Sequence, residues 1–232
     1  MVFPLWDDDP FHKPHVPWVT WSLIGINAVL FLWTDGSISS DALLTKYGAV
    51  PGQISHPFAN GWRPEFGLIT SMFLHAGWAH ILGNMAYLWV FGDDIEEALG
   101  PWRFLLFYFA AGIAAALAFI AVNPSSTVPM VGASGAISGV LAAYLMLRPC
   151  AKVTVLFFRA VFRVRAYWVI GGWGVLQVAS LWLTGQDDDI AYMAHVGGFL
   201  AGAVLFFVLR PAGIQLFECI GQGPEVERAT ST

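Results

Sequence analysis

Six apolar stretches, each long enough to cross a lipid bilayer, limit this sequence to a small set of folds. An α-helix needs roughly 17–25 apolar residues to cross the hydrocarbon core. Lipid gives the backbone no hydrogen-bond partners, and no segment alternates as the strands of a membrane barrel do, so we predict a helix in each stretch. The expected fold class is all-α: one polytopic bundle of six transmembrane helices within residues 16–210. The predicted spans are about Val16–Trp33, Trp78–Leu99, Trp102–Val122, Val131–Leu147, Tyr167–Leu183 and Ile190–Leu209.

The low charge of the chain supports a membrane location and excludes other partners. Of the 232 residues, 57% are hydrophobic and 12% are charged, the latter about half the share expected of a soluble domain. The net charge of -5 leaves no basic face for nucleic acid, so the lipid bilayer is the predicted environment. Cys150 and Cys219 fit neither a disulfide scaffold nor a metal-ligand spacing, and we expect two ordinary thiols.

The segments outside the spans are interpreted from their polarity. Residues 34–77 are broken by prolines yet too apolar to float free, which indicates a large first loop lying partly in the membrane interface. Residues 1–15 open with acidic residues and prolines, unlike a cleavable signal peptide, and are expected to form an N-terminal cytoplasmic tail. Residues 211–232 are expected to form a C-terminal cytoplasmic tail that is disordered over Gln222–Thr232.

Lysine and arginine predict the orientation of the bundle, because loops rich in these residues stay on the cytoplasmic side. We predict a protein of the cell (plasma or inner) membrane with both termini in the cytoplasm. In this orientation, only Lys46 and Arg63 face outward. The remaining basic residues then all face the cytoplasm: Lys13, Arg103, Arg148, Lys152, Arg159, Arg163, Arg165, Arg210 and Arg228.

Polar side chains inside apolar spans are costly and usually functional. His80 and Asn84 lie four residues apart, and so on one face of the second span. Ser134 lies near the start of the fourth span and His195 near the start of the sixth. In the predicted topology these three spans all run from outside to inside, so the four residues share a depth just below the outer surface. A shared depth is what a single site requires.

Small residues would let the helices that carry Ser134 and His195 approach each other closely. Faces lined with glycine pack backbone against backbone. The glycines that we expect around the site are Gly132, Gly135 and Gly139 on the fourth span and Gly198 and Gly202 on the sixth.

A serine hydroxyl beside an imidazole indicates a nucleophilic hydrolase, because histidine titrates in the range needed to take the serine proton. N–H donors from His80, Asn84 and the Ser134 backbone could bind the oxyanion that forms during acyl transfer. The carboxylates of these spans, such as Asp93 and Glu96, lie at the far end of the second span, so no third member is expected beside the pair. We therefore predict a dyad, with Ser134 as nucleophile and His195 as general base.

Other interpretations of these residues stay open. Ser134 could belong to ordinary glycine packing between helices. His75 and His80 are five residues apart and lack a nearby carboxylate, so no metal or other cofactor is predicted. A small transporter or channel is disfavoured, because the polar residues cluster in the outer half and no internal repeat is found.

The chain resembles the rhomboid family of intramembrane serine proteases, of the six-span prokaryotic type, over about Phe66–Leu209. The resemblance rests on four motifs that occur in order on the expected spans. They are the run from Leu74 to Asn84 with its two histidines, Phe91-Gly92 followed by Glu96, Gly132-Ala133-Ser134-Gly135, and Ala194-His195-Val196-Gly197-Gly198 with Gly202.

This resemblance implies that Ser134 is the nucleophile, that His195 is the general base, and that His80 and Asn84 line the oxyanion hole. The family needs no metal or ATP and cleaves single-span transmembrane substrates near their outer membrane boundary. The fifth span and the loop Thr184–Tyr192 would form a lateral gate and cap. The alternative is a rhomboid-like pseudoprotease that binds or escorts membrane clients, although such relatives usually lack the serine or the histidine.

Two positions depart from the family pattern. Some members carry an aromatic residue four positions after the nucleophile, stacked on the catalytic histidine. Here that position is Ser138, so His195 must be oriented in another way. Trp62-Arg63 resembles a pair often found in the first loop, but it lies farther upstream of His80 than expected, and we assign it no role.

Overall fold

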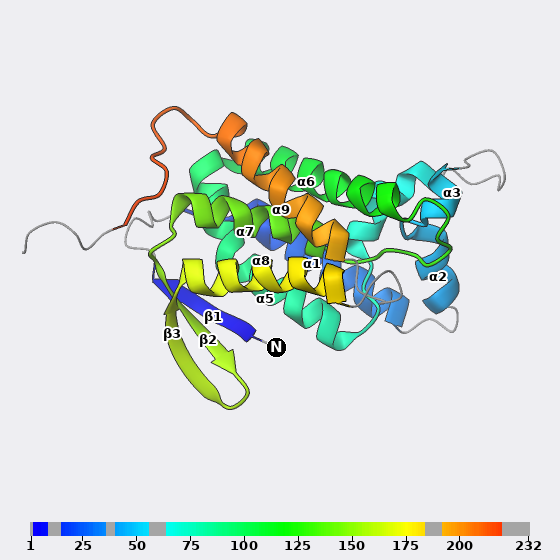
Figure 1. The fold of residues 1–232 in the computed structure, drawn as a ribbon, viewed down its shortest axis with the longest axis horizontal. Helices are drawn as coiled ribbons and strands as arrows, with labels where there is room; N and C mark the ends of the chain where they lie inside the picture. The colour runs from blue at the N-terminus through cyan, green and yellow to red at the C-terminus, as the bar shows by residue number, and fades with distance from the viewer. Residues whose placement is uncertain (1, 9–14, 36–39, 56–63, 184–191, 220–232) are drawn as a thin grey trace, which may run out of the picture.

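The computed structural model describes residues 2–8, 15–35, 40–55, 64–183 and 192–219. A helix lies in each of the six apolar stretches, and these helices run roughly along the long axis of the molecule (Figure 1). Their bounds are α1 Trp18–Asp35, α5 Trp78–Leu99, α6 Pro101–Val122, α7 Ser134–Leu147, α8 Ala166–Leu183 and α9 Tyr192–Leu209.

Three of these helices, α6, α8 and α9, are long and apolar enough to cross a membrane, among the residues that the structure describes. Their outer surfaces carry large exposed apolar side chains, such as Trp168, Leu176 and Trp182 on α8. Exposed apolar surface on this scale is unfavourable in water and matches a lipid environment.

α7 is the central helix of the bundle and is buried along nearly its whole length. It packs against α5, α6, α8 and α9, and its apolar character on all sides fits such a position. The Tyr144 ring meets the Phe91 ring of α5 edge to face, with centroids 4.8 Å apart.

The fold is mostly helical, as predicted, but a three-stranded antiparallel sheet that the sequence did not predict closes one end of the bundle (Figure 1). Its strands are β1 Val2–Asp8, β2 Lys152–Phe157 and β3 Ala160–Arg165, in the order β1-β2-β3. Along β2, Val153 and Val155 are buried, and β-branched residues of this kind favour strands. Residues 2–8, expected to be part of a tail, are the edge strand of this sheet.

The cysteines also differ from the prediction of two ordinary thiols, because Cys150 and Cys219 form a disulfide. The bond joins the end of α7 to residues 211–219, which fold back onto the bundle. There the Phe217 backbone N–H donates to the Met146 carbonyl at 2.7 Å, and Arg148 pairs with Glu218. Residues 220–232, expected to be disordered in part, lie outside the described residues.

The first loop contributes short helices at the end of the molecule opposite the sheet (Figure 1). Ala49 of this loop pairs with Met130, through backbone hydrogen bonds of 3.0 and 2.9 Å. The loop therefore holds the chain that leads into α7. Its elements are α2 Ser40–Tyr47, α3 Pro51–Ser55, η2 Pro64–Phe66, α4 Gly67–Thr70 and η3 Ser71–Phe73.

A side chain from α5 caps the N-terminus of α1. Glu96 is 1% exposed, and its carboxylate accepts hydrogen bonds from the backbone N–H groups of Val19 and Thr20 and from the Thr20 hydroxyl, at 2.8–3.0 Å. A carboxylate at this position satisfies donors that the first helical turn leaves open and complements the positive end of the helix dipole.

Candidate active site

Ser134 is the first residue of α7, and the turn before it depends on a glycine. Gly132 has φ +119°, a conformation that side chains other than glycine rarely adopt. Its backbone N–H donates to the Ser71 carbonyl of the first loop at 2.9 Å. This turn places the Ser134 side chain at the open end of α7.

Ser134 and His195 are in hydrogen-bond contact. The Ser134 Oγ lies 2.8 Å from Nε2 of His195, which is in the first turn of α9. Both side chains are half-buried. For the hydroxyl to donate to Nε2, the imidazole must carry its proton on Nδ1.

Backbone contacts between α7 and α9 set this distance. A β-carbon on Gly198 would lie 2.1 Å from the Gly135 carbonyl oxygen, and one on Gly202 would lie 2.2 Å from the Gly139 Cα. Real side chains cannot enter such spaces, so the two helices meet main chain to main chain. The glycines expected around the site therefore lie at the α7–α9 contact, apart from Gly132 in the turn before α7.

His80 and Asn84 of α5 face the turn before Ser134. A β-carbon on Gly132 would lie 2.5 Å from His80 Nε2 and 3.6 Å from Asn84 Nδ2. Asn84 is 7% exposed, and its Nδ2 has no hydrogen-bond partner among the described residues. Buried donors are nearly always paired, so an open amide N–H beside a serine is a group ready to bind an acceptor. The N–H groups of the first α7 turn also lack helical partners.

His75 supports this arrangement from the loop before α5. Its ring meets the His80 ring edge to face, with centroids 5.1 Å apart. Burial, together with the neighbouring His80, lowers the pKa of His75 to about 3, so the ring is neutral. Within the described residues, no group of three or more His, Cys, Asp or Glu side chains could hold a metal ion.

A family model described as the rhomboid domain matches residues 60–212, about two thirds of the chain. The chain belongs to the rhomboid family. The match includes each of the residues described above, and it confirms the resemblance noted in the sequence.

Curated relatives support this membership. The chain is 36% identical to the rhomboid protease GluP of Bacillus subtilis over 202 residues, which cover 85% of this chain and 35% of that protein. It is 31% identical to the putative rhomboid protease YdcA of the same organism, over 80% of this chain and 85% of that protein. Rhomboid protein 1 of Saccharomyces cerevisiae mitochondria is 28% identical, over 87% of this chain and 56% of that protein.

The chain thus spans about a third of GluP and most of YdcA. A rhomboid domain together with apolar helices of this length makes it a multi-pass membrane protein. Rhomboid proteases are hydrolases that act on transmembrane substrates within the bilayer. The pair Trp62-Arg63 lies outside the described residues.

In this rhomboid, the Ser138 side chain bonds to the backbone of its own helix. It is fully buried, and its hydroxyl donates to the Ser134 carbonyl at 2.6 Å, one helical turn back. Two residues of α8 contact His195 instead. The Gln177 Oε1 lies 2.7 Å from His195 Nδ1, and the Trp173 ring lies 5.8 Å from the imidazole, centroid to centroid.

Neither residue was predicted from the sequence to lie at the site. Gln177 carried a usable signal, because a side-chain amide in an apolar span is costly and needs a partner. The predicted site included polar residues of the second, fourth and sixth spans only. Trp173 carried no such signal, since aromatic residues are common in membrane helices.

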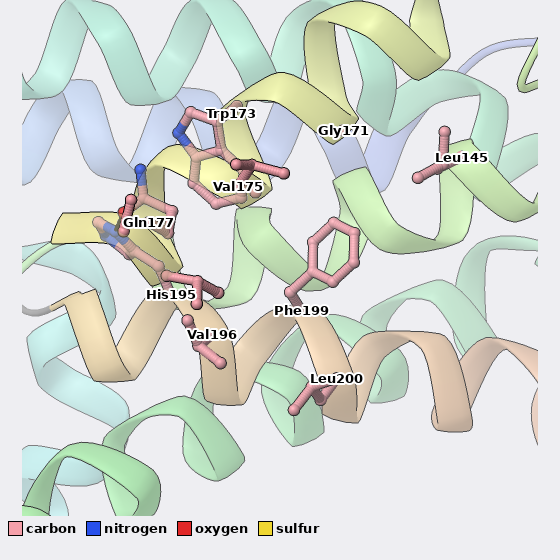
Figure 2. A pocket seen from close by; sticks show the side chains of 12 residues that line it. Leu145, Gly171, Trp173, Val175, Gln177, His195, Val196, Phe199 and Leu200 are labelled. Atoms are coloured by element: carbon pink, nitrogen blue, oxygen red, sulfur yellow. Dashed lines mark hydrogen bonds between the residues drawn. The ribbon is translucent and has the colours of Figure 1, made fainter. Parts of the chain in front are cut away.

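An apolar cleft of about 570 Å³ opens between α8 and α9 beside the site. Figure 2 shows Gln177 next to His195 at one end of this cleft, and Leu145 of α7 at the other. The lining is otherwise aliphatic and aromatic, with Phe199 and Leu200 contributed by α9. A cleft of this composition can take an apolar chain and bring it to the imidazole.

Proposed function

We propose that this rhomboid is an intramembrane serine protease that hydrolyses peptide bonds of single-span transmembrane substrates near their outer membrane boundary. Ser134 is the nucleophile and His195 is the general base. The observation that carries this proposal is the 2.8 Å hydrogen bond between Ser134 Oγ and His195 Nε2, on two helices whose contact is made by backbone.

This geometry supports the following reaction. His195 Nε2 takes the hydroxyl proton as Ser134 Oγ attacks the substrate carbonyl, which gives a tetrahedral oxyanion. The Asn84 amide, the His80 ring and the Ser134 backbone N–H donate to that oxyanion. His195 then gives the proton to the leaving amine, and the C–N bond breaks to leave an acyl-enzyme. Water, deprotonated by the same imidazole, hydrolyses the ester and restores the Ser134 hydroxyl.

We further propose six membrane spans with both termini in the cytoplasm of a cell-membrane protein. The distribution of basic residues supports this orientation. Lys46 lies in α2, at the end of the molecule that carries the first loop. In and around the hairpin of the sheet, at the other end, are Arg148, Lys152, Arg159, Arg163 and Arg165.

Access to the site is proposed to run past α8, as the family resemblance implies. α8 is the most exposed of the long helices: Ala166 and Ile170, near its start, are its buried residues. A helix held at one end can separate from its neighbours with little loss of packing. Of the expected cap, Thr184–Tyr192, residues 184–191 lie outside the described residues, and Tyr192 begins α9.

Ser134→Ala tests the assignment of the nucleophile. The variant is expected to abolish cleavage of a single-span substrate in liposomes, and labelling by a fluorophosphonate, without a change in thermal stability. Ser22→Ala, which removes an exposed hydroxyl on α1, is the matched control and should keep parental activity. Equal cleavage by the parent and Ser134→Ala would refute the assignment.

The alternative function is that of a pseudoprotease that binds membrane clients. It predicts a parent that neither cuts nor reacts with the fluorophosphonate, but that still retains a client helix. The contact between Ser134 and His195 favours the protease.

A further inference from the structure

We propose that Gln177 is the positioning residue for the base of this protease: it holds the Nδ1–H of His195, so that Nε2 faces Ser134. The inference rests on the proposed function and deepens it. It converts the predicted dyad into a Ser134–His195–Gln177 chain of hydrogen bonds, with the third member on α8. Figure 2 shows Gln177 of α8 beside the His195 ring of α9.

Two distances on opposite sides of one ring carry the argument. His195 Nε2 lies 2.8 Å from Ser134 Oγ, and His195 Nδ1 lies 2.7 Å from Gln177 Oε1. A neutral imidazole has one N–H and one lone pair. If Nε2 is to accept the serine proton, then Nδ1 must donate, and the Gln177 carbonyl oxygen is its acceptor. Gln177 thereby selects the tautomer that catalysis needs.

The location of Gln177 supports a specific role. It has the only side-chain amide of α8, in a helix made otherwise almost entirely of apolar residues. Amides in membrane helices are retained where they bond across a helix interface. Trp173, one turn earlier on the same helix, lies against the same imidazole. α8 thus offers His195 an acceptor at one nitrogen and an aromatic surface beside the ring.

An amide differs from the carboxylate of a Ser-His-Asp triad in what it can contribute. A carboxylate fixes the tautomer and also stabilises the imidazolium by its charge. A neutral amide fixes only orientation and tautomer. The expected contribution is therefore smaller than that of a triad aspartate, and it acts on the chemical step and not on substrate affinity.

Gln177→Leu removes the acceptor while keeping similar bulk. We expect kcat for a single-span substrate to fall by about 10- to 100-fold with KM nearly unchanged, the range that follows from a misplaced catalytic group. The rate at which a fluorophosphonate labels Ser134 should fall by a similar factor, because this small probe reports the nucleophile without requiring a docked helix. Leu176→Ala, at an exposed neighbouring position, is the control and should keep both rates.

Gln177→Glu keeps the acceptor oxygen and adds a negative charge. This variant provides the test if Gln177→Leu is too unstable to assay. The carboxylate still orients Nδ1–H and now also stabilises the protonated imidazole. Because the base must be neutral to act, the acid limb of the pH–kcat profile should move to higher pH. Above that limb, the rate should recover to near the parental value.

The outcomes separate this inference from the proposed function. A parent that neither cuts nor labels at Ser134 would refute the protease itself. With an active parent, parental kcat and labelling in Gln177→Leu would refute the role of Gln177. A rise in KM alone would also refute it, since that result would make Gln177 a substrate contact.

Discussion

At the residue scale, the site combines a hydrogen-bonded pair of side chains with a buried N–H donor that lacks a partner among the described residues. Ser134 and His195 already bond to each other, and Gln177 bonds to His195. Asn84 differs, because its buried Nδ2 has no partner among the described residues. An unpaired N–H destabilises the resting protein, but it gains an acceptor when an oxyanion forms nearby.

Asn84→Ala is therefore expected to separate activity from stability. Loss of one oxyanion donor should lower kcat on the order of 100-fold, while the melting temperature stays the same or rises slightly. Cleavage kinetics and thermal unfolding in the same detergent would measure both quantities. Asn123→Ala, whose side-chain amide donates to the Phe119 carbonyl at the end of α6, should leave the kinetics unchanged. A stability loss in Asn84→Ala as large as the activity loss would contradict the oxyanion role.

The sequence correctly predicted that Ser134 and His195 lie together, because both were expected at the same depth in the membrane. Ser134 and His195 stood out because each is polar and lies near the start of a span that was predicted to run inward. Gln177 was missed because its partner is Nδ1 of His195, a residue that was already predicted to bond to Ser134. Contacts of that kind depend on how α8 is rotated, which apolar composition does not determine.

At the element scale, α7 and α9 behave as one unit. Gly198 and Gly202 meet Gly135 and Gly139 through main-chain atoms, which leaves no adjustable side chain between them. The spacing of Ser134 and His195 therefore depends on the glycines.

Gly202→Ala should force these helices apart, because the new β-carbon would lie 2.2 Å from the Gly139 Cα. We expect a loss of about 1–3 kcal/mol in stability from overpacking and a fall in kcat on the order of 100-fold from displacement of the base. Gly172→Ala provides the comparison, since nothing lies within 4 Å of its β-carbon position on α8. Parental kcat in Gly202→Ala would show that the contact does not set the site.

Glu96→Ala addresses the junction of α5 with α1. The change leaves the first turn of α1 without its acceptor, and we expect a loss of about 2–4 kcal/mol in unfolding free energy. Glu97→Ala is the matched comparison, because that carboxylate is partly exposed and should cost far less. Thermal unfolding followed by circular dichroism would measure both, and equal losses would contradict the capping role.

The sheet shows where prediction of elements from this sequence failed. The strands β2 and β3 are short and lie between two apolar spans, so hydropathy assigned them to a cytoplasmic loop. The partner of β2 is β1, which lies about 150 residues earlier in the sequence: Val2 pairs with Phe157 and Asp8 pairs with Lys152. Periodicity within one segment does not identify such a distant partner.

At the scale of the whole molecule, charge is distributed unevenly along the long axis. The hairpin end carries most of the described basic residues, and the end with the first loop carries Lys46. The site lies nearer the first loop, because Ser71 and Ala49 hold the chain that enters α7.

Cysteine labelling would test this orientation in whole cells. In a Cys150→Ser/Cys219→Ser background, Lys46→Cys should react with a membrane-impermeant maleimide added outside. Arg159→Cys, exposed at the hairpin, should react only after the membrane is permeabilised. The reverse pattern would overturn the assignment of both termini to the cytoplasm.

The disulfide was not predicted because it depends on the fold of the whole chain. Cys150 and Cys219 are 69 residues apart, and only the return of residues 211–219 to the end of α7 brings them together. The predicted orientation puts this pair on the reducing side of the membrane, where thiols are the usual state. The number and spacing of the cysteines predicted free thiols, but the fold brings the two sulfurs together.

The glycine contact between α7 and α9 has a consequence for how this molecule can vary. Since main-chain atoms fix the gap between hydroxyl and imidazole, most side chains on the outer surfaces of the bundle can be exchanged without altering it. Substitutions of lipid-facing side chains alone would therefore adapt the protein to membranes of different thickness or lipid content. Engineering the lipid-facing surface should leave the chemistry intact for as long as those glycines are kept.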